Sequence, residues 1–214
     1  MKYNTYLFDF DGTLVDSMPS FISVMLRILD ENNVKYESDI IKIITPLGYQ
    51  GTARYFVENF GLKQSESELI EAMNRYAYDE YAYRIKAKKN VIETLKELKS
   101  RGADLHVLTA SPHIVLDVCL KRLGIFDLFT NVWSCDDFKT TKANPKIYEM
   151  AAKRIGKPIE EILFLDDNYS ADKTAASVKM KVCGVFDKSS EVYTEEIKGI
   201  SDHYICDFSE LLFL

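Results

Sequence analysis

A buried strand that ends on two carboxylates is the feature that most constrains this chain. Residues 6–8 are apolar or aromatic without helical spacing, and Asp9, Asp11 and Gly12 follow directly. Two acids one residue apart repel each other, and burial raises their pKa values unless a cation lies between them. Ligands of parallel sheets bind beyond the carboxyl ends of the strands. An isolated Asp-Gly is usually a turn, but three further polar clusters follow downstream, so we interpret Asp9 and Asp11 as part of a site.

Composition sets modest limits. A chain of 214 residues suits one domain with a large insertion or two small domains. The net charge of −6 gives no reason to expect nucleic acid or an anionic membrane as a partner. The four cysteines form no CxxC pair, which favours reduced thiols in a cytoplasmic protein over a disulfide framework or zinc site. The start leads straight into a strand without a signal peptide, and no apolar run reaches the roughly 20 residues needed to cross a bilayer.

Helical periodicity begins after Ser17 and continues for most of the next seventy residues. The apolar spacing predicts helices over 18–29, 38–44, 52–60 and 65–84, with a loop at 47–51. Ser65 and Glu68 have the spacing of a capping box, and Gly61 ends the third helix. We therefore expect a helical domain of residues 16–87, inserted between residues 1–15 and 88–214 of a second domain.

Helices and strands alternate from Asn90 onward. Helices are expected over 91–100, 111–123, 145–154 and 172–179, and strands over 103–109, 132–133, 162–165, 182–186 and the start of the tail at 202–214, which a short helix closes. This alternation predicts an α/β fold, with a Rossmann-like parallel sheet that carries helices on both faces. Right-handed crossovers place the carboxyl ends of the strands along one edge.

Three kinds of polar group are expected at that edge or in the loops beside it. They are the acids Asp9, Asp11, Asp166 and Asp167, the anion-binding segment Thr109, Ala110 and Ser111, and the cation Lys142. Several carboxylates suit Mg²⁺, which keeps water or substrate oxygens in its remaining positions. Hydroxyl groups, backbone N–H groups and a lysine suit an anion. The set is complementary to a phosphoryl group on Mg²⁺.

Four motifs carry a resemblance to a known family. Residues 9–16 match a DxDGT(L/V)xD signature, and residues 105–109 are an apolar run that ends in Thr. Residues 142–148 resemble a KPxPxxY-like motif with Ala143 where proline is usual, and residues 162–167 are an apolar strand that ends in an acid pair. The chain thus resembles the haloacid dehalogenase (HAD) superfamily, in the phosphoglycolate phosphatase/β-phosphoglucomutase-like branch with a helical cap.

The resemblance implies a role for each acid. Asp9 would be the nucleophile that forms an aspartyl-phosphate, and Asp11 the general acid and then the base that activates water. Mg²⁺ would be held by Asp9, the backbone carbonyl of Asp11 and Asp167, with Asp166 as a further ligand or a supporting acid. Asp172 is either a weak member of the site or a charge at a helix N-terminus, and we favour the helix charge.

The remaining roles concern the substrate. The resemblance implies that Thr109 and the N–H of Ala110 bind phosphoryl oxygens, while Lys142 neutralises charge and orients Asp9. In the cap, residues 45–52 and Arg54 lie where this branch contacts substrate, and Arg54 is the best candidate there. His106, His113 and the acid pair at 136–137 are better explained as structural or surface residues.

These roles predict a Mg²⁺-dependent phosphatase that acts on a small phosphorylated metabolite, such as phosphoglycolate or a sugar phosphate, with a monomer as the simple expectation. One alternative is a β-phosphoglucomutase-type mutase, which returns the phosphoryl group to a sugar. A non-catalytic phospho-receiver or regulatory module is disfavoured, because receivers lack a helical insertion. A phosphonatase needs a cap lysine in a supporting context, and a haloacid dehalogenase does not need the metal that these acids serve.

Overall fold

The computed structural model describes residues 2–214 and contains a six-stranded parallel sheet in the order β3-β2-β1-β4-β5-β6. The strands are β1 (Thr5–Phe8), β2 (Asp104–Thr109), β3 (Asn131–Ser134), β4 (Ile162–Asp166), β5 (Lys181–Val185) and β6 (His203–Ile205). Strand β1 lies at the centre, where Phe8 pairs with Val107 of β2 on one side and with Leu165 of β4 on the other. Every residue of β1 is buried, as expected for a strand covered on both faces.

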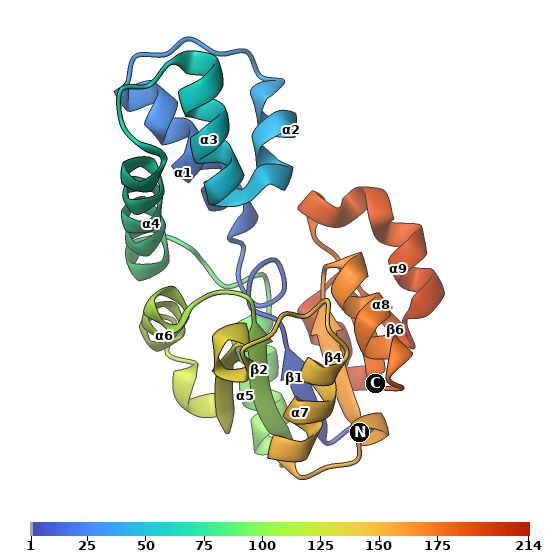
Figure 1. Cartoon of the computed structure of the whole chain (residues 1–214). Coiled ribbons are helices and arrows are strands. Elements are labelled where there is room, and N and C mark those ends of the chain that lie inside the picture. The colour runs from blue at the N-terminus through green and yellow to red at the C-terminus, as the bar shows by residue number, and fades with distance from the viewer. Residues whose placement is uncertain (1) are drawn as a thin grey trace. The chain divides into compact units, whose positions relative to one another are not determined.

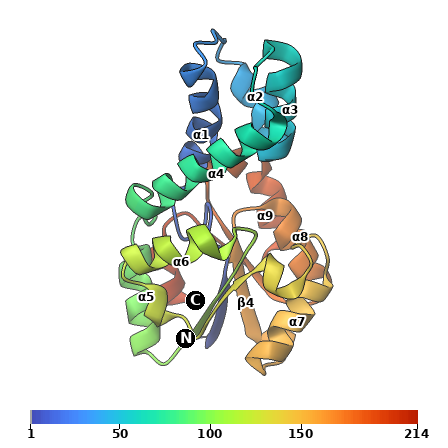
Figure 2. The same ribbon diagram turned by 60° about the vertical axis from the view of Figure 1, so that its left-hand side comes forward.

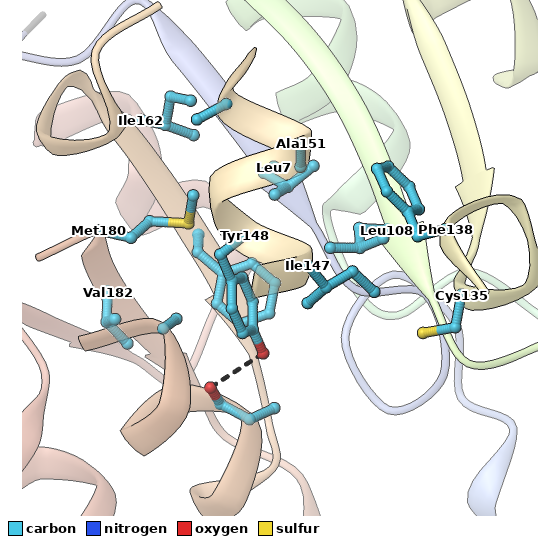
Figure 3. Packing of buried hydrophobic residues seen from close by; sticks show 14 residues of the cluster. Leu7, Leu108, Cys135, Phe138, Ile147, Tyr148, Ala151, Ile162, Met180 and Val182 are labelled. Atoms are coloured by element: carbon cyan, nitrogen blue, oxygen red, sulfur yellow. Dashed lines mark hydrogen bonds between the residues drawn. The ribbon is translucent and has the colours of Figure 1, made fainter. Parts of the chain in front are cut away.

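Helices cover both faces of this sheet, as the sequence predicts. They are α5 (Val91–Ser100), α6 (His113–Arg122), α7 (Lys146–Ile155), α8 (Tyr169–Ser177) and α9 (Thr194–Ile200). Figures 1 and 2 place α5 and α7 on opposite faces. On the face of α7, Leu7, Ile147 and Tyr148 belong to one buried cluster (Figure 3). On the other face, Phe8 packs against Phe208 of the short helix η6 (Phe208–Phe213). The predicted α/β fold is therefore confirmed.

The largest differences between predicted and observed elements of the sheet region lie at α8 and between β5 and β6. Helix α8 begins at Tyr169, earlier than expected, because the side chain of Asn168 accepts hydrogen bonds from the N–H groups of Ser170 and Ala171 and caps the helix there. The segment between β5 and β6 holds η5 (Lys188–Tyr193) and α9, which we did not predict. Both helices are short, and a segment of this length does not show a clear periodicity of apolar residues.

Residues 17–85 form a separate compact unit, the helical unit, while the residues up to Asp16 and Lys86–Leu214 form the α/β unit. The helical unit contains α1 (Met18–Glu31), α2 (Ile40–Ile44), η1 (Thr45–Leu47), α3 (Gly48–Phe60) and α4 (Glu66–Tyr83) around one apolar cluster. The capping box of Ser65 and Glu68 is present, and Gly61 adopts the left-handed conformation past α3 with φ of 62°. Within residues 2–214, no helix is both long and apolar enough to cross a membrane.

The loop predicted at 47–51 is wrong. The chain passes from η1 directly into α3, which begins at Gly48. The hydroxyl of Thr52 donates to the carbonyl of Ile44 (3.2 Å), and Thr52 and Ala53 are buried. Packing of this turn against the apolar cluster therefore overrides the loop signal of its two glycines.

Candidate active site

The parallel register brings three strand ends together. Asp9 follows β1, and its N–H donates to the carbonyl of Leu165 in β4 (2.8 Å). Asp166 is the last residue of β4, while Thr109 is the last residue of β2 on the other side of β1. The acid clusters after β1 and β4 are thus neighbours because their strands are paired, although more than 150 residues separate them in the sequence.

Asp9, Asp166 and Asp167 form a buried acid triad. Each offers one carboxylate oxygen, and these three oxygens lie within 4.8 Å of one another. Burial, followed by the charge of Asp166, raises the pKa of Asp9 to about 7, although Lys142 acts in the opposite direction. Burial and the charges of Asp166 and Asp9 also raise the pKa of Asp167 well above its usual range. Burial and the repulsion between these acids therefore disfavour their charged forms unless a cation shares the site.

Lys142 bridges two members of the triad. Its ammonium group donates to Oδ1 of Asp9 and to Oδ2 of Asp166, the latter at 2.8 Å. The lysine side chain is 13% exposed. Burial alone would lower the pKa of Lys142, but the charges of Asp166 and Asp9 raise it above its ordinary value, so the amine is charged. Because the N–H of Asn168 donates to Oδ1 of Asp166 (2.8 Å), both oxygens of Asp166 accept hydrogen bonds.

Tyr148 forms a hydrogen bond with the backbone of Lys142, a contact that was not predicted from the sequence. Its side chain is fully buried in α7. Its hydroxyl lies 3.1 Å from the carbonyl oxygens of Lys142 and of Ala171, and the dashed line in Figure 3 marks the second contact. Tyr148 thereby connects the lysine loop to α8. The fixed spacing of residues 142 and 148 in the third motif was the available signal.

Thr13 holds the carboxylate of Asp167, and this role too was not foreseen. The buried hydroxyl of Thr13 donates to Oδ1 of Asp167 (3.0 Å). Gly12 packs against the same carboxylate, because a Cβ placed on residue 12 would lie 2.5 Å from Oδ2 of Asp167. These two contacts explain why glycine and threonine follow Asp11. Glycine lets the Asp167 carboxylate lie close to the backbone, and threonine donates a hydrogen bond to that carboxylate.

Asp11 lies on the same loop and meets the segment after β2. The hydroxyl of Ser111 donates to Oδ2 of Asp11. Thr109 is buried, and its hydroxyl oxygen accepts from the N–H of Ser111 (3.1 Å), while Ala110 between them is exposed. Ser111 was expected only as an anion donor, and its hydroxyl contact with Asp11 was not predicted.

Asp172 lies in the first turn of α8 but is fully buried. Among the residues that the structure describes, neither of its carboxylate oxygens has a hydrogen-bond partner. Burial and the charges of Asp166 and Asp167 raise its pKa well above the usual range. A solvated charge at a helix N-terminus is therefore a poor description of Asp172, because the carboxyl group is buried close to the triad.

The contacts of the remaining candidates are with residues outside the triad. Arg54 belongs to α3 of the helical unit, where its exposed guanidinium lies 3.6 Å from Glu66. His113 is half-exposed and contacts Asp117 (2.8 Å) and Asp137 (2.9 Å), and these partners raise its pKa. His106 is buried in β2 and stacks on Trp133. The role of Arg54 stays a prediction.

Comparison with known proteins agrees with the motifs. The family model for haloacid dehalogenase-like hydrolases matches residues 6–185. Pyrophosphatase PpaX of Bacillus velezensis is 29% identical over 187 residues, which cover 86% of this chain and 83% of the relative.

Solved structures share the fold. A proposed β-phosphoglucomutase from Thermotoga maritima superimposes with a TM-score of 0.84 at 20% identity, covering 98% of this chain and 97% of that one. A predicted phosphoglycolate phosphatase from Haemophilus somnus gives 0.81 at 21% identity, covering 100% and 98%. With the family model, these likenesses confirm the resemblance read from the motifs: the chain belongs to the haloacid dehalogenase-like hydrolase family.

Proposed function

We propose that this protein is a Mg²⁺-dependent phosphatase that hydrolyses a small phosphorylated metabolite through an aspartyl-phosphate on Asp9. The observation that carries the proposal is the contact of Lys142 with Asp9 inside the buried acid triad. The lysine orients the Asp9 carboxylate and balances part of the charge that an incoming phosphoryl group brings. Phosphoryl transfer needs chiefly such positioning and charge stabilisation.

The donor set of the triad fits Mg²⁺. All three groups are carboxylates, and their oxygens are close enough to share one ion. Burial, followed by the charges of the neighbouring acids, raises the pKa values of Asp9 and Asp167, and a cation between them would favour their charged forms. Asp9, Asp167 and the backbone carbonyl of Asp11 would hold the ion, whereas the two hydrogen bonds of Asp166 favour a role for that acid in positioning Lys142. When bound, Mg²⁺ would stabilise negative charge on the phosphoryl oxygens.

Each protein group then has one task in the reaction. A carboxylate oxygen of Asp9 attacks phosphorus, while the hydroxyl of Thr109 and the N–H of Ala110 bind phosphoryl oxygens. Asp11 gives a proton to the leaving oxygen and later takes one from the water that hydrolyses the aspartyl-phosphate. The hydroxyl of Ser111 orients Asp11 for both transfers.

The two compact units would divide the work. The α/β unit carries all the acids and Lys142, and would be the catalytic core. The helical unit would be the cap, where Arg54 contacts the end of the substrate that does not react. Phosphoglycolate, sugar phosphates and pyrophosphate are the substrates to try first. The pyrophosphatase name of the relative adds the last of these.

Phosphate release from a panel of these substrates, with and without Mg²⁺, tests the proposal. Asp9→Asn keeps the shape of the side chain and should abolish release, whereas the control Asp136→Asn, which changes an exposed acid after β3, should not. Release by Asp9→Asn at the wild-type rate contradicts the proposal. Isomerisation of a sugar phosphate without release would indicate a mutase, and a lasting aspartyl-phosphate without turnover would indicate a receiver.

A further inference from the structure

Lys88 of the α/β unit, like Lys142, donates hydrogen bonds from its ammonium group to several acceptors. Its ammonium group donates to the carbonyl of Gly12 (2.6 Å), the carbonyl of Phe186 (2.5 Å) and Oδ2 of Asp187 (3.0 Å). An ammonium group has three donors, so these contacts use all of them. Its side chain is 20% exposed. The side chain of Lys88 thus connects two segments of the chain, the loop that contains Gly12 and the adjacent residues Phe186 and Asp187.

The first of these two segments is the catalytic loop, residues 10–16. Gly12 lies between Asp11 and Thr13, the residue that holds Asp167. Backbone bonds connect the same loop to the segment of Lys88, since the N–H of Lys88 donates to Leu14 (3.0 Å) and that of Asp16 to Lys86 (3.0 Å). These bonds fix the base of the loop, whereas the side chain of Lys88 reaches its tip at Gly12.

The second segment, Phe186 and Asp187, follows β5 directly and is held by hydrogen bonds of its own. Asp187 is buried, and its Oδ1 accepts from the N–H (2.9 Å) and the hydroxyl (2.7 Å) of Ser189. Burial works against ionisation of Asp187, but the hydrogen bonds of Ser189 and the charge of Lys88 outweigh it and lower the pKa. The carboxylate is thus charged, fixed and paired with Lys88.

We propose that Lys88 is a positioning residue that holds the tip of the catalytic loop, and with it Asp11, where the leaving oxygen is protonated. The inference rests on the proposed phosphatase function and adds a residue to it. Lys88 touches neither the triad nor the substrate in this account, and acts only through Gly12. A displaced tip would misplace the acid Asp11 more than the nucleophile Asp9, which the start of the loop and β4 hold separately.

This difference predicts a dependence on the leaving group. Alkyl phosphates need a proton on the departing oxygen, whereas p-nitrophenyl phosphate departs with little help from an acid. The ratio kcat/KM reports phosphoryl transfer to Asp9, whereas kcat also contains the hydrolysis of the aspartyl-phosphate, which is the same step for both substrates. At saturating Mg²⁺, Lys88→Ala should therefore lower kcat/KM about tenfold to a hundredfold for an alkyl phosphate. It should lower kcat/KM much less for p-nitrophenyl phosphate.

The cavity beside Lys88 offers a second readout. It has a volume of about 360 Å³ and is lined in part by Lys86, Lys88, Phe186 and Asp187. In Lys88→Ala, ethylammonium should enter it, replace the missing donors and restore turnover of the alkyl phosphate. Tetramethylammonium carries the same charge without an N–H group and should not.

Two further variants make the test sharp. Lys86→Ala removes an exposed lysine from the same cavity and should behave like the wild type. Lys88→Met keeps the aliphatic stem without the donors, so it should show the same leaving-group dependence even if Lys88→Ala folds poorly. An equal loss of kcat/KM for both substrates, no loss, or equal rescue by both ammonium ions would overturn the inference. A wild type without phosphatase activity, or an active Asp9→Asn, would instead overturn the proposed function.

Discussion

Gly12 and Asp167 are in such close contact that no side chain fits between them. A Cβ on Gly12 would lie 2.5 Å from Oδ2 and 2.6 Å from Oδ1 of Asp167, well inside van der Waals contact. The carboxylate cannot easily withdraw, because Thr13 holds it and it is buried. The backbone of Gly12 also has φ of 76°, a region that other residues adopt at a cost. The loop after β1 and the acid after β4 are therefore fitted to each other.

Gly12→Ala is expected to lose activity because its methyl group displaces the Asp167 carboxylate. We expect a decrease in kcat/KM of about a hundredfold. Gly156→Ala is the matched control, since Gly156 has φ of 78° but nothing within 4 Å of its would-be Cβ. Both variants should lose about 1–2 kcal/mol of stability from the left-handed backbone. Thermal unfolding and phosphate release, measured together, check the prediction, and equal activity of the two variants would refute it.

Thr13→Val should weaken metal binding with little effect on the fold. The substitution keeps the size of the side chain and removes the hydroxyl that donates to Asp167. Loss of such a supporting hydrogen bond typically costs tenfold to a hundredfold in metal affinity. The Mg²⁺ concentration for half-maximal activity should rise by about that factor, while Thr94→Val, at a buried threonine of α5, leaves it unchanged. An unaltered Mg²⁺ titration of Thr13→Val would count against the role of this hydrogen bond.

Strand ends and their acids could be predicted from the sequence, but the hydrogen bonds between them could not. Asp9 and Asp166 end apolar runs, and strand pairing then places them at one edge. The contacts of Thr13 with Asp167 and of Ser111 with Asp11 join residues 154 and 100 positions apart. Such contacts depend on side-chain rotamers and on local backbone shape, which no apolar period encodes.

Removing the Lys142 ammonium should damage both stability and activity. Lys142→Met leaves Asp9 and Asp166 buried without their common cation. Breaking a buried ion pair from one side typically costs about 3–5 kcal/mol. Denaturant unfolding at neutral pH should show a loss of that order, and phosphate release should cease. Lys146→Met, at an exposed lysine at the start of α7, is the control for a general change in charge. Wild-type stability of Lys142→Met would mean that the acids are not ionised together.

The stability of the metal-free protein should fall as the pH rises through the titration range of Asp9. Its pKa is raised from 3.8 to about 7 in the folded state, so the folded protein binds this proton more tightly than the unfolded chain does. The stabilising contribution is complete below about pH 4 and is lost progressively up to about pH 7. Asp9→Asn removes this titration. In EDTA, the free energy of unfolding of the wild type should therefore fall between about pH 5 and pH 8 by on the order of 2 kcal/mol more than that of Asp9→Asn.

Mg²⁺ should reverse part of that loss, because it favours the charged acids of the triad. Its addition is expected to raise the melting temperature of the wild type more at about pH 8 than at about pH 5. For the metal-free protein, an equal loss of stability with pH in the wild type and in Asp9→Asn would show that Asp9 does not titrate as described.

The burial of Asp172 and the helices before β6 could not be predicted from the sequence, because both depend on tertiary packing. An acid in the first turn of a helix normally faces solvent and the helix dipole favours it there. Here the position of α8 against β4 and β5 buries the carboxyl group, and a tertiary contact of this kind leaves no local signal. The unforeseen η5 and α9 likewise depend on packing, as Ile197 is the one residue of α9 that is buried.

The central claim is that Asp9 itself accepts the phosphoryl group. Enzyme quenched with acid during turnover and then reduced with borohydride converts an aspartyl-phosphate to homoserine, which peptide mass spectrometry locates. We expect homoserine at position 9 in the wild type with substrate and Mg²⁺, and none without substrate or in Asp9→Asn. Homoserine at another aspartate, or its absence at position 9 while phosphate is being released, would contradict the account.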